Sequence, residues 1–259
     1  MEILFSFLIC LLATTIGGIS GVGGGVIIKP VLDAASGMPV ATVSFLSGCT
    51  VLAMTITSML RSRGGEVKVE PRRGTLLAIG AAVGGVVGKE LFELVRASGG
   101  SAVSVAQQVM MIVLTLGVLV YTLNRPRIAA KDVKNPAACV TIGLVLGLLS
   151  AFLGIGGGPI NLAVLYYFFS MDTKTAALNS LYIILFSQGA SFLNTILRDT
   201  VPEFQWPVLI VMVIGGVVGG TLGRSISKRL SNSGVDRLFF WLLIAITGIS
   251  CYNLVRCFV

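Results

Sequence analysis

The chain lacks histidine altogether, and its 259 residues carry little charge of either sign. It has 19 Lys and Arg and 11 Asp and Glu, so charged residues make up only 12% of the sequence. Without histidine the chain cannot form a Ser-His or Cys-His nucleophile or a histidine-ligated zinc site. The long apolar segments also hold no acidic pair away from their ends. We therefore expect no catalytic residues, no metal site, no cofactor and no enzymatic activity.

Cysteines are few, and long polar stretches are missing. The longest polar loops are Arg61–Arg73 and Asn124–Asn135, which leave no room for a soluble domain. No basic residue precedes the first apolar run, so we do not expect a secretory signal. The five cysteines lie in or beside apolar runs without paired spacing, and we expect them to pack as small apolar side chains; they are Cys10, Cys49, Cys139, Cys251 and Cys257.

Apolar residues dominate the sequence instead. Hydrophobic residues make up 55% of it and the mean hydropathy is +0.94, far from the balance of a soluble domain. About 20 apolar residues are needed for a helix to cross a membrane. The sequence therefore predicts an all-α polytopic membrane protein. Its predicted crossings are residues 43–60, 74–95, 103–123, 176–197, 205–224 and 238–254.

Two further apolar stretches, residues 3–36 and 136–170, are interrupted by the same motif. Gly21–Gly25 and Gly154–Gly158 share the pattern Gly-x-Gly-Gly-Gly and lie 133 residues apart. Ser47 and Ser180 recur at the same spacing. A Val-Gly-Gly-x-x-Gly segment ending in Lys89 or Arg224 recurs at a spacing of 135. We therefore predict two repeat units, residues 1–124 and 136–259, joined by a cytoplasmic linker at 125–135.

The basic residues predict how the two units are oriented. If each interrupted stretch crossed the membrane once, Lys and Arg would divide 11 to 8 between the two sides. If each is instead a re-entrant hairpin, the division is 14 to 5, which the positive-inside rule strongly favours. The second arm, Val26–Ser36, would be about 16 Å long, half of a bilayer. We expect two inverted repeats, each a hairpin plus three transmembrane helices, with both termini extracytoplasmic.

The hairpin tips predict an anion site. A glycine-rich turn at membrane depth leaves backbone N–H groups without helical partners, and the helix that follows directs its positive end to the same place. Glycine breaks in both halves of a membrane protein are the best pointer to a transporter's binding site. Lys29 is either a site residue or the partner of Asp33 four residues on. The predicted substrate-binding residues are Gly23, Gly24, Gly25, Lys29, Ser47, Gly156, Gly157, Gly158, Asn161, Asn179, Ser180 and Gln188.

The paired glycine motif, Pro30 and the Ser47/Ser180 pair resemble the sulfite exporter TauE/SafE family of permeases over essentially the whole chain. The resemblance implies export of sulfite, sulfonates or related anions, with Gly21–Gly25 and Gly154–Gly158 as the loops nearest the substrate. The sequence departs from the family pattern at Pro159, which directly follows the second glycine run, and at Lys29, where an apolar residue is expected.

Together these features predict a secondary transporter of the inner membrane that exports a small sulfur-containing oxyanion by alternating access. Its expected partners are the anion and the lipid bilayer, not nucleic acid, and the sequence does not indicate an oligomeric state. Two alternatives stay open, namely cation-coupled uptake of such an anion and a membrane scaffold that transports nothing.

Overall fold

The structure, a computed structural model, describes residues 2–62, 67–99 and 101–256, and every regular element in these ranges is helical. Eight of the described helices are long and apolar enough to cross a membrane, which confirms the expectation of an all-α polytopic membrane protein. The elements are α1 (Glu2–Ser20), α2 (Gly25–Ala35), α3 (Val40–Ser62), α4 (Pro71–Gly99), α5 (Ser101–Asn124), η1 (Arg125–Arg127), α6 (Pro136–Leu153), α7 (Gly158–Phe169), α8 (Thr173–Leu197), α9 (Trp206–Arg229) and α10 (Asn232–Arg256).

The six predicted crossings correspond to α3, α4, α5, α8, α9 and α10, and the helices extend a few residues beyond most of the predicted ends. Local chemistry sets some of these ends. Asp172 caps α8 by accepting hydrogen bonds from the N–H groups of Lys174 and Thr175. Pro71 opens α4, where its missing N–H costs no helical bond. Hydropathy marks only the membrane-embedded part of a helix, so it underestimates the full length.

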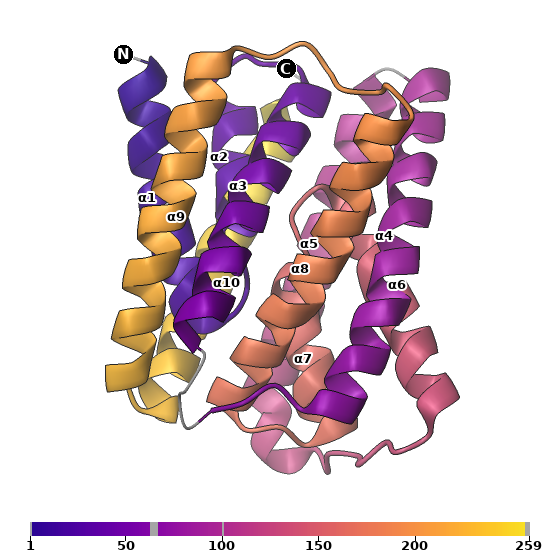
Figure 1. Ribbon diagram of the computed structural model, residues 1–259, viewed down its shortest axis with the longest axis vertical. Coiled ribbons are helices and arrows are strands. Elements are labelled where there is room, and N and C mark those ends of the chain that lie inside the picture. The colour runs from indigo at the N-terminus through magenta and orange to yellow at the C-terminus, as the bar shows by residue number, and fades with distance from the viewer. Residues whose placement is uncertain (1, 63–66, 100, 257–259) are drawn as a thin grey trace.

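Both interrupted stretches consist of a long and a short helix. By length α1 and α6 could each cross a membrane, whereas α2 and α7 have 11 and 12 residues. At about 1.5 Å per residue the short arms are roughly half a bilayer thick. In Figure 1, α2 runs back toward the end of the molecule where α1 begins, and α7 runs back toward the opposite end.

Glycine conformations produce the breaks. Helix α6 stops at Gly154, whose φ of 66° and ψ of 23° are left-handed, and its N–H bonds to the carbonyl of Ala151. Gly157, with φ of 107°, then precedes α7. In the first half Gly21 and Gly23 have φ of 79° and 82°. Side chains other than glycine are strained in this region, so both breaks depend on glycine.

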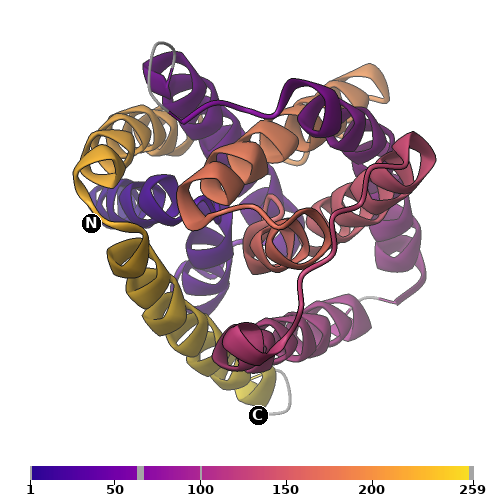
Figure 2. The same ribbon diagram turned by 90° about the horizontal axis from the view of Figure 1, so that it is seen from below.

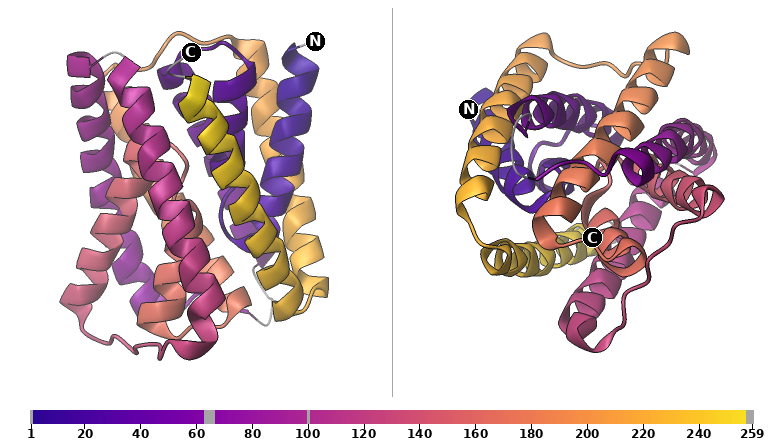
Figure 3. Two further views of the ribbon diagram at one scale, coloured as in Figure 1. Left: turned by 180° about the vertical axis from the view of Figure 1, so that it is seen from behind. Right: turned by 60° about the horizontal axis from the view of Figure 1, so that its bottom comes forward.

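The helices form one bundle with the start of α1 and the end of α10 at the same end (Figure 1). Seen from below, α5 and α10 lie side by side along one edge, away from α4 and α6 (Figure 2). The rear view shows α5 and α10 in front of the two broken segments (Figure 3). The short helices α2 and α7 therefore lie inside the bundle, surrounded by the long helices.

Small residues at four-residue spacing pack α4 on α6 and α9 on α1. A Cβ atom at Gly84 would overlap the carbonyl oxygen of Leu144, and one at Gly88 would overlap that of Leu148. The equivalent glycines of α9, Gly219 and Gly223, meet the carbonyls of α1 in the same way. The Val-Gly-Gly-x-x-Gly segments thus let helices approach closely. They also pair the fourth helix of each half with the broken segment of the other half.

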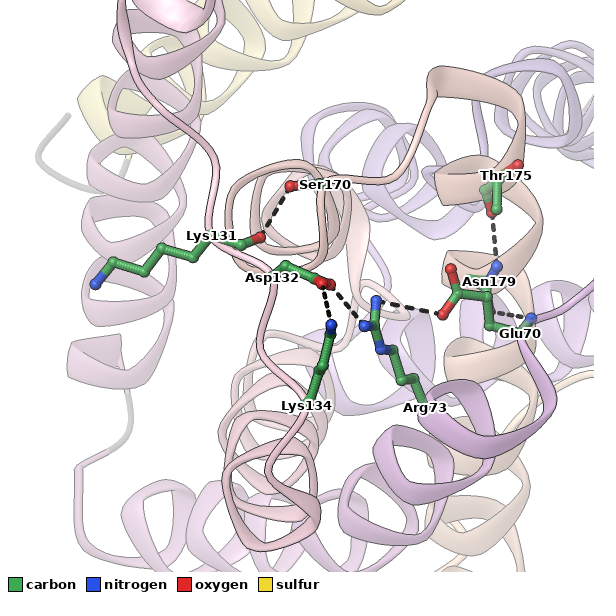
Figure 4. A network of polar contacts seen from close by, with 8 residues as sticks. All are labelled: Glu70, Arg73, Lys131, Asp132, Lys134, Ser170, Thr175 and Asn179. Carbon is green, nitrogen blue, oxygen red and sulfur yellow. Dashed lines mark hydrogen bonds and ion pairs between the residues drawn. The ribbon is translucent and has the colours of Figure 1, made fainter.

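The linker docks on the end of the bundle where α7 finishes. Asp132 pairs with Arg73 at 2.6 Å and with Lys134 at 3.2 Å (Figure 4). The amides of Lys131 and Val133 donate to the carbonyls of Tyr167 and Phe168. Hydrogen bonds from Lys134 and then Arg73 hold the pKa of Asp132 below its usual range.

Candidate functional site

The two glycine loops meet each other in the interior. A Cβ at Gly25 would lie 2.5 Å from the carbonyl oxygen of Ile155, and one at Gly158 would lie 2.5 Å from the side chain of Val26. The contacts around them are reciprocal: Gly23 faces Ile184 of α8, whereas Gly156 faces Val51 of α3. Both pairs are spaced by 133 residues, as in the sequence repeat. The loops therefore occupy equivalent places in the two halves.

Several main-chain donors at this junction lack a partner among the described residues. In the described part of the chain, the N–H groups of Gly24, Gly156 and Gly157 meet no acceptor, and all three residues are buried. Gly24 and Gly157 stand directly before α2 and α7, whose first N–H groups are also free of helical bonds. Because buried backbone N–H groups are almost always paired, donors left open here are suited to an anion.

Several predicted side chains present buried polar atoms without partners near the junction. Ser47 and Ser180 are fully buried, and neither hydroxyl makes a hydrogen bond among the described residues. Ser47 lies one turn before Val51, and Ser180 one turn before Ile184, so both hydroxyls are on the helix turns that flank the loops. Asn161 lies against Gly157, and its Oδ1 is likewise buried and unpaired. Such groups call for a ligand or ordered water.

Lys29 pairs with Asp33, as one of its two interpretations predicts, and it also lines a cavity. Its Nζ donates to Asp33 Oδ2 at 2.8 Å and to Gln107 Oε1 at 3.1 Å. Gln107 in turn donates to the carbonyl of Phe152, in the last turn of α6. This chain of bonds connects the two broken segments through α5. The cavity beside it measures about 230 Å³ and is lined by Lys29, Asp33, Met38, Val40, Gln107, Gln108, Asn253 and Arg256.

A second cavity of about 40 Å³ lies on the other side of Gly154, and we call it the Lys89 cavity. Since roughly 10–15 Å³ of such space holds one water, it has room for a few waters or a small ion. Gln188, a predicted site residue, lines it and donates to Ser150. The cavity is lined by Ser44, Phe45, Gly48, Cys49, Lys89, Phe92, Ala151, Gly154, Gln188, Ser191, Phe192 and Thr195.

Asn179 lies apart from this junction, at the end of the bundle where the linker docks. Its Oδ1 accepts from the backbone N–H of Glu70, and its Nδ2 donates to the carbonyl of Thr175 (Figure 4). Both ends of the amide are thus occupied by the protein. This arrangement ties the start of α4 to α8.

Sequence reasoning missed several residues of the two cavities, notably Lys89, Gln107, Gln108 and Asn253. The repeat pairs Lys89 with Arg224, but the segment that contains each of them is typical of close helix packing and does not single out the cation. Gln107 and Gln108 sit in a helix without glycine breaks or acidic residues, so nothing in the pattern distinguishes them. Only folding brings α5 and α10 beside α2.

The comparisons with known proteins cover nearly the whole chain. Residues 6–250 match the family model described as sulfite exporter TauE/SafE. The chain is also 24% identical, over 91% of its length and 92% of the relative's, to the probable membrane transporter protein YunE of Bacillus subtilis (strain 168). No solved structure matches it significantly. The chain therefore belongs to the sulfite exporter TauE/SafE family of membrane transporters.

Proposed function

We propose that the protein exports a small sulfur-containing oxyanion, sulfite or an organosulfonate, across the inner membrane. The observation that carries this proposal is the contact between the two glycine loops, with the buried, unpaired N–H groups of Gly24, Gly156 and Gly157 at it. The substrate named in the family description agrees with such a site. An oxyanion offers several acceptor oxygens, and converging amides can bind these oxygens without a side-chain charge.

In this proposal side chains complete the coordination. Ser47 and Ser180 supply hydroxyls from α3 and α8, and the amide of Asn161 adds a donor beside Gly157. Lys29 contributes positive charge from α2, with Asp33 and Gln107 keeping it in place. Gln188 lies on the route through the Lys89 cavity. The site is thus shared between both halves of the chain.

The same proposal makes the two units, residues 1–124 and 136–259, an inverted duplication. The reciprocal contacts of the loops and the paired contacts of α4 with α6 and α9 with α1 support it. Both termini would be extracytoplasmic, with the linker 125–135 in the cytoplasm. Rocking of one packed group against the other would then expose the loops to each side in turn, as in other inverted-repeat transporters.

One observation favours the alternative of cation-coupled uptake. Three oxygens in the cavity beside Lys29 are buried without partners in the described chain: Asp33 Oδ1, Gln108 Oε1 and Asn253 Oδ1. Oxygens grouped in this way could hold a sodium ion or a proton-bearing group. Export of an anion needs no such ion, because an interior-negative potential favours exit by about 2.3 kcal/mol per charge per 100 mV.

Reconstitution of the purified protein in liposomes tests the proposal. Currents would be recorded after concentration jumps of sulfite, a sulfonate, sulfate and a carboxylate, with and without sodium or proton gradients. We expect sulfite or sulfonate currents that need no ion gradient. A requirement for sodium or protons would establish coupled transport instead. Absence of both current and anion flux with every anion would contradict transport and favour a scaffold.

A further inference from the structure

Among the described residues the interior of the bundle holds three buried cations, and one of them has no counter-ion there. Lys29, Lys89 and Arg224 are 2%, 8% and 4% exposed. Lys29 pairs with Asp33 at 2.8 Å, and Lys89 pairs with Glu93 at 3.1 Å. Within residues 2–62, 67–99 and 101–256 no carboxylate pairs with Arg224, and its Nε is buried without an acceptor. A buried cation whose Nε lacks a partner and which has no paired carboxylate is unfavourable, so its presence requires an explanation.

Arg224 lies where α9 meets the last turn of α1 and the second half of α3. Its neighbour Gly223 packs against Gly18, and Ser227 donates to the carbonyl of Ile19. On α3, Ser58 donates to the carbonyl of Gly220. Thr55, Ser58 and Ser62 are all buried, and their spacing of three and four places them on one face of the helix. Three buried hydroxyl-bearing residues therefore lie in the second half of α3, which packs against α9.

The repeat spacing makes this arrangement the counterpart of the Lys89 cavity. Arg224 corresponds to Lys89 at a spacing of 135. Thr55, Ser58 and Ser62 correspond, at a spacing of 133, to Gln188, Ser191 and Thr195, all of which line the Lys89 cavity. Gly21, packed tightly on Ala177, corresponds to Gly154, which also lines that cavity. One half thus holds an open polar cavity, and the other holds the same kinds of groups closely packed.

We propose that Arg224 binds the transported anion in the half of the pathway that is closed in this structure, with Thr55, Ser58 and Ser62 lining the route from there to the glycine loops. A guanidinium presents a planar fork that fits two oxygens of an oxyanion. The bound anion is then the missing counter-ion. The half in question is the one toward the end of α9, which the charge pattern assigns to the cytoplasm. This inference rests on the proposed function.

Thermal unfolding of the purified protein, with and without sulfite and a simple alkylsulfonate, tests the assignment. The variants are Arg224→Met, Arg224→Lys and the control Lys228→Gln, one turn further along α9. In wild type and the control we expect the anions to raise the unfolding temperature. In Arg224→Met we expect an apparent affinity weakened about tenfold or more, because charged hydrogen bonds are lost. Arg224→Lys keeps the positive charge without the planar fork, so we expect its apparent affinity for the anions to lie between those of wild type and Arg224→Met.

The unfolding temperature without anion separates a binding role from a structural one. Removal of an unpaired buried cation leaves no orphaned partner, so Arg224→Met is at least as stable as wild type when no anion is present. The assignment would be overturned if Arg224→Met were less stable than wild type without anion. It would also be overturned if Arg224→Met responded to anions as the control does. Liposome currents distinguish the remaining case. If wild type transports and Arg224→Met is fully active, only this inference is overturned. If wild type neither binds nor transports any of the anions, the proposed function is overturned as well.

Discussion

At the scale of single residues, the chain balances buried charge by pairing. Lys29 and Asp33 are only 3% and 10% exposed at their side chains, and Gln107 completes the set by bonding both Lys29 and the carbonyl of Phe152. Such a set is stable only when intact, since each member left alone is a buried polar group without a partner.

Replacing Lys29 by Met is therefore expected to cost about 3–5 kcal/mol of stability, because Asp33 is left as an uncompensated buried charge. The double variant Lys29→Met/Asp33→Asn should recover much of that loss. Unfolding temperatures in detergent would measure both. If the double variant is as unstable as the single one, the ion pair is not what the substitution disturbs.

At the scale of helices and loops, glycine has two separate roles. Gly84 and Gly219 let long helices approach each other, whereas Gly157 adopts a φ of 107° that other residues avoid. A Cβ atom added at Gly117 or Gly248, by contrast, would meet no atom within 4 Å. Gly84 and Gly219 are needed for helix packing and Gly157 for the local conformation of its loop, whereas Gly117 and Gly248 meet neither requirement.

Ala substitution separates these roles. At Gly84 or Gly219 the added methyl group overlaps a backbone carbonyl, and we expect a loss of about 1–3 kcal/mol from overpacking. At Gly117 the same change should be neutral or should stabilise by about 0.5–1 kcal/mol, because Ala is the better helix former. Unfolding temperatures of the three variants check this, and equal losses at all three would refute the packing role.

Docking of the linker depends on Asp132, whose pKa is lowered by Lys134 and Arg73. Because the pKa of Asp132 is lowered in the folded state, the stabilisation that its carboxylate gives to the docked linker is fully present above the usual aspartate pKa of about 3.9. This stabilisation is lost as the pH falls through the lowered pKa. Asp132→Asn should remove the same stabilisation at neutral pH as well. Hydrogen exchange at the amides of Lys131 and Val133 should be faster in that variant; unchanged exchange would show that Asp132 does not hold the linker.

At the scale of the whole molecule, the start of α1 and the end of α10 lie at one end and the linker at the other (Figure 1). If the positive-inside rule sets the orientation, reporter enzymes that are active only outside the cytoplasm should work when fused at the C-terminus and fail when inserted between residues 127 and 131. The opposite pattern would reverse the assignment of the two sides.

Much of this architecture could be predicted from the sequence, because hydropathy and glycine repeats act locally. The glycine breaks and the helices at the six predicted crossings follow from composition and spacing alone. The polar cavities could not be predicted. Gln107, Asn253 and Lys89 reach them from helices far apart in the sequence, and amides or single cations in apolar helices carry no periodic pattern. The position of Asn179 at the start of a long helix predicts it near the site, yet its amide is bonded at the end of the bundle.

The most direct test of the central claim, that the glycine loops bind the transported anion, is the sulfite current of Gly157→Ala in liposomes. A side chain at this φ is strained and would meet Asn161 Nδ2 at 2.5 Å. Gly117→Ala, reconstituted in equal amount, is the control. We expect the control to carry the wild-type current and Gly157→Ala to lose most of it while remaining folded. Full current from Gly157→Ala would contradict the account.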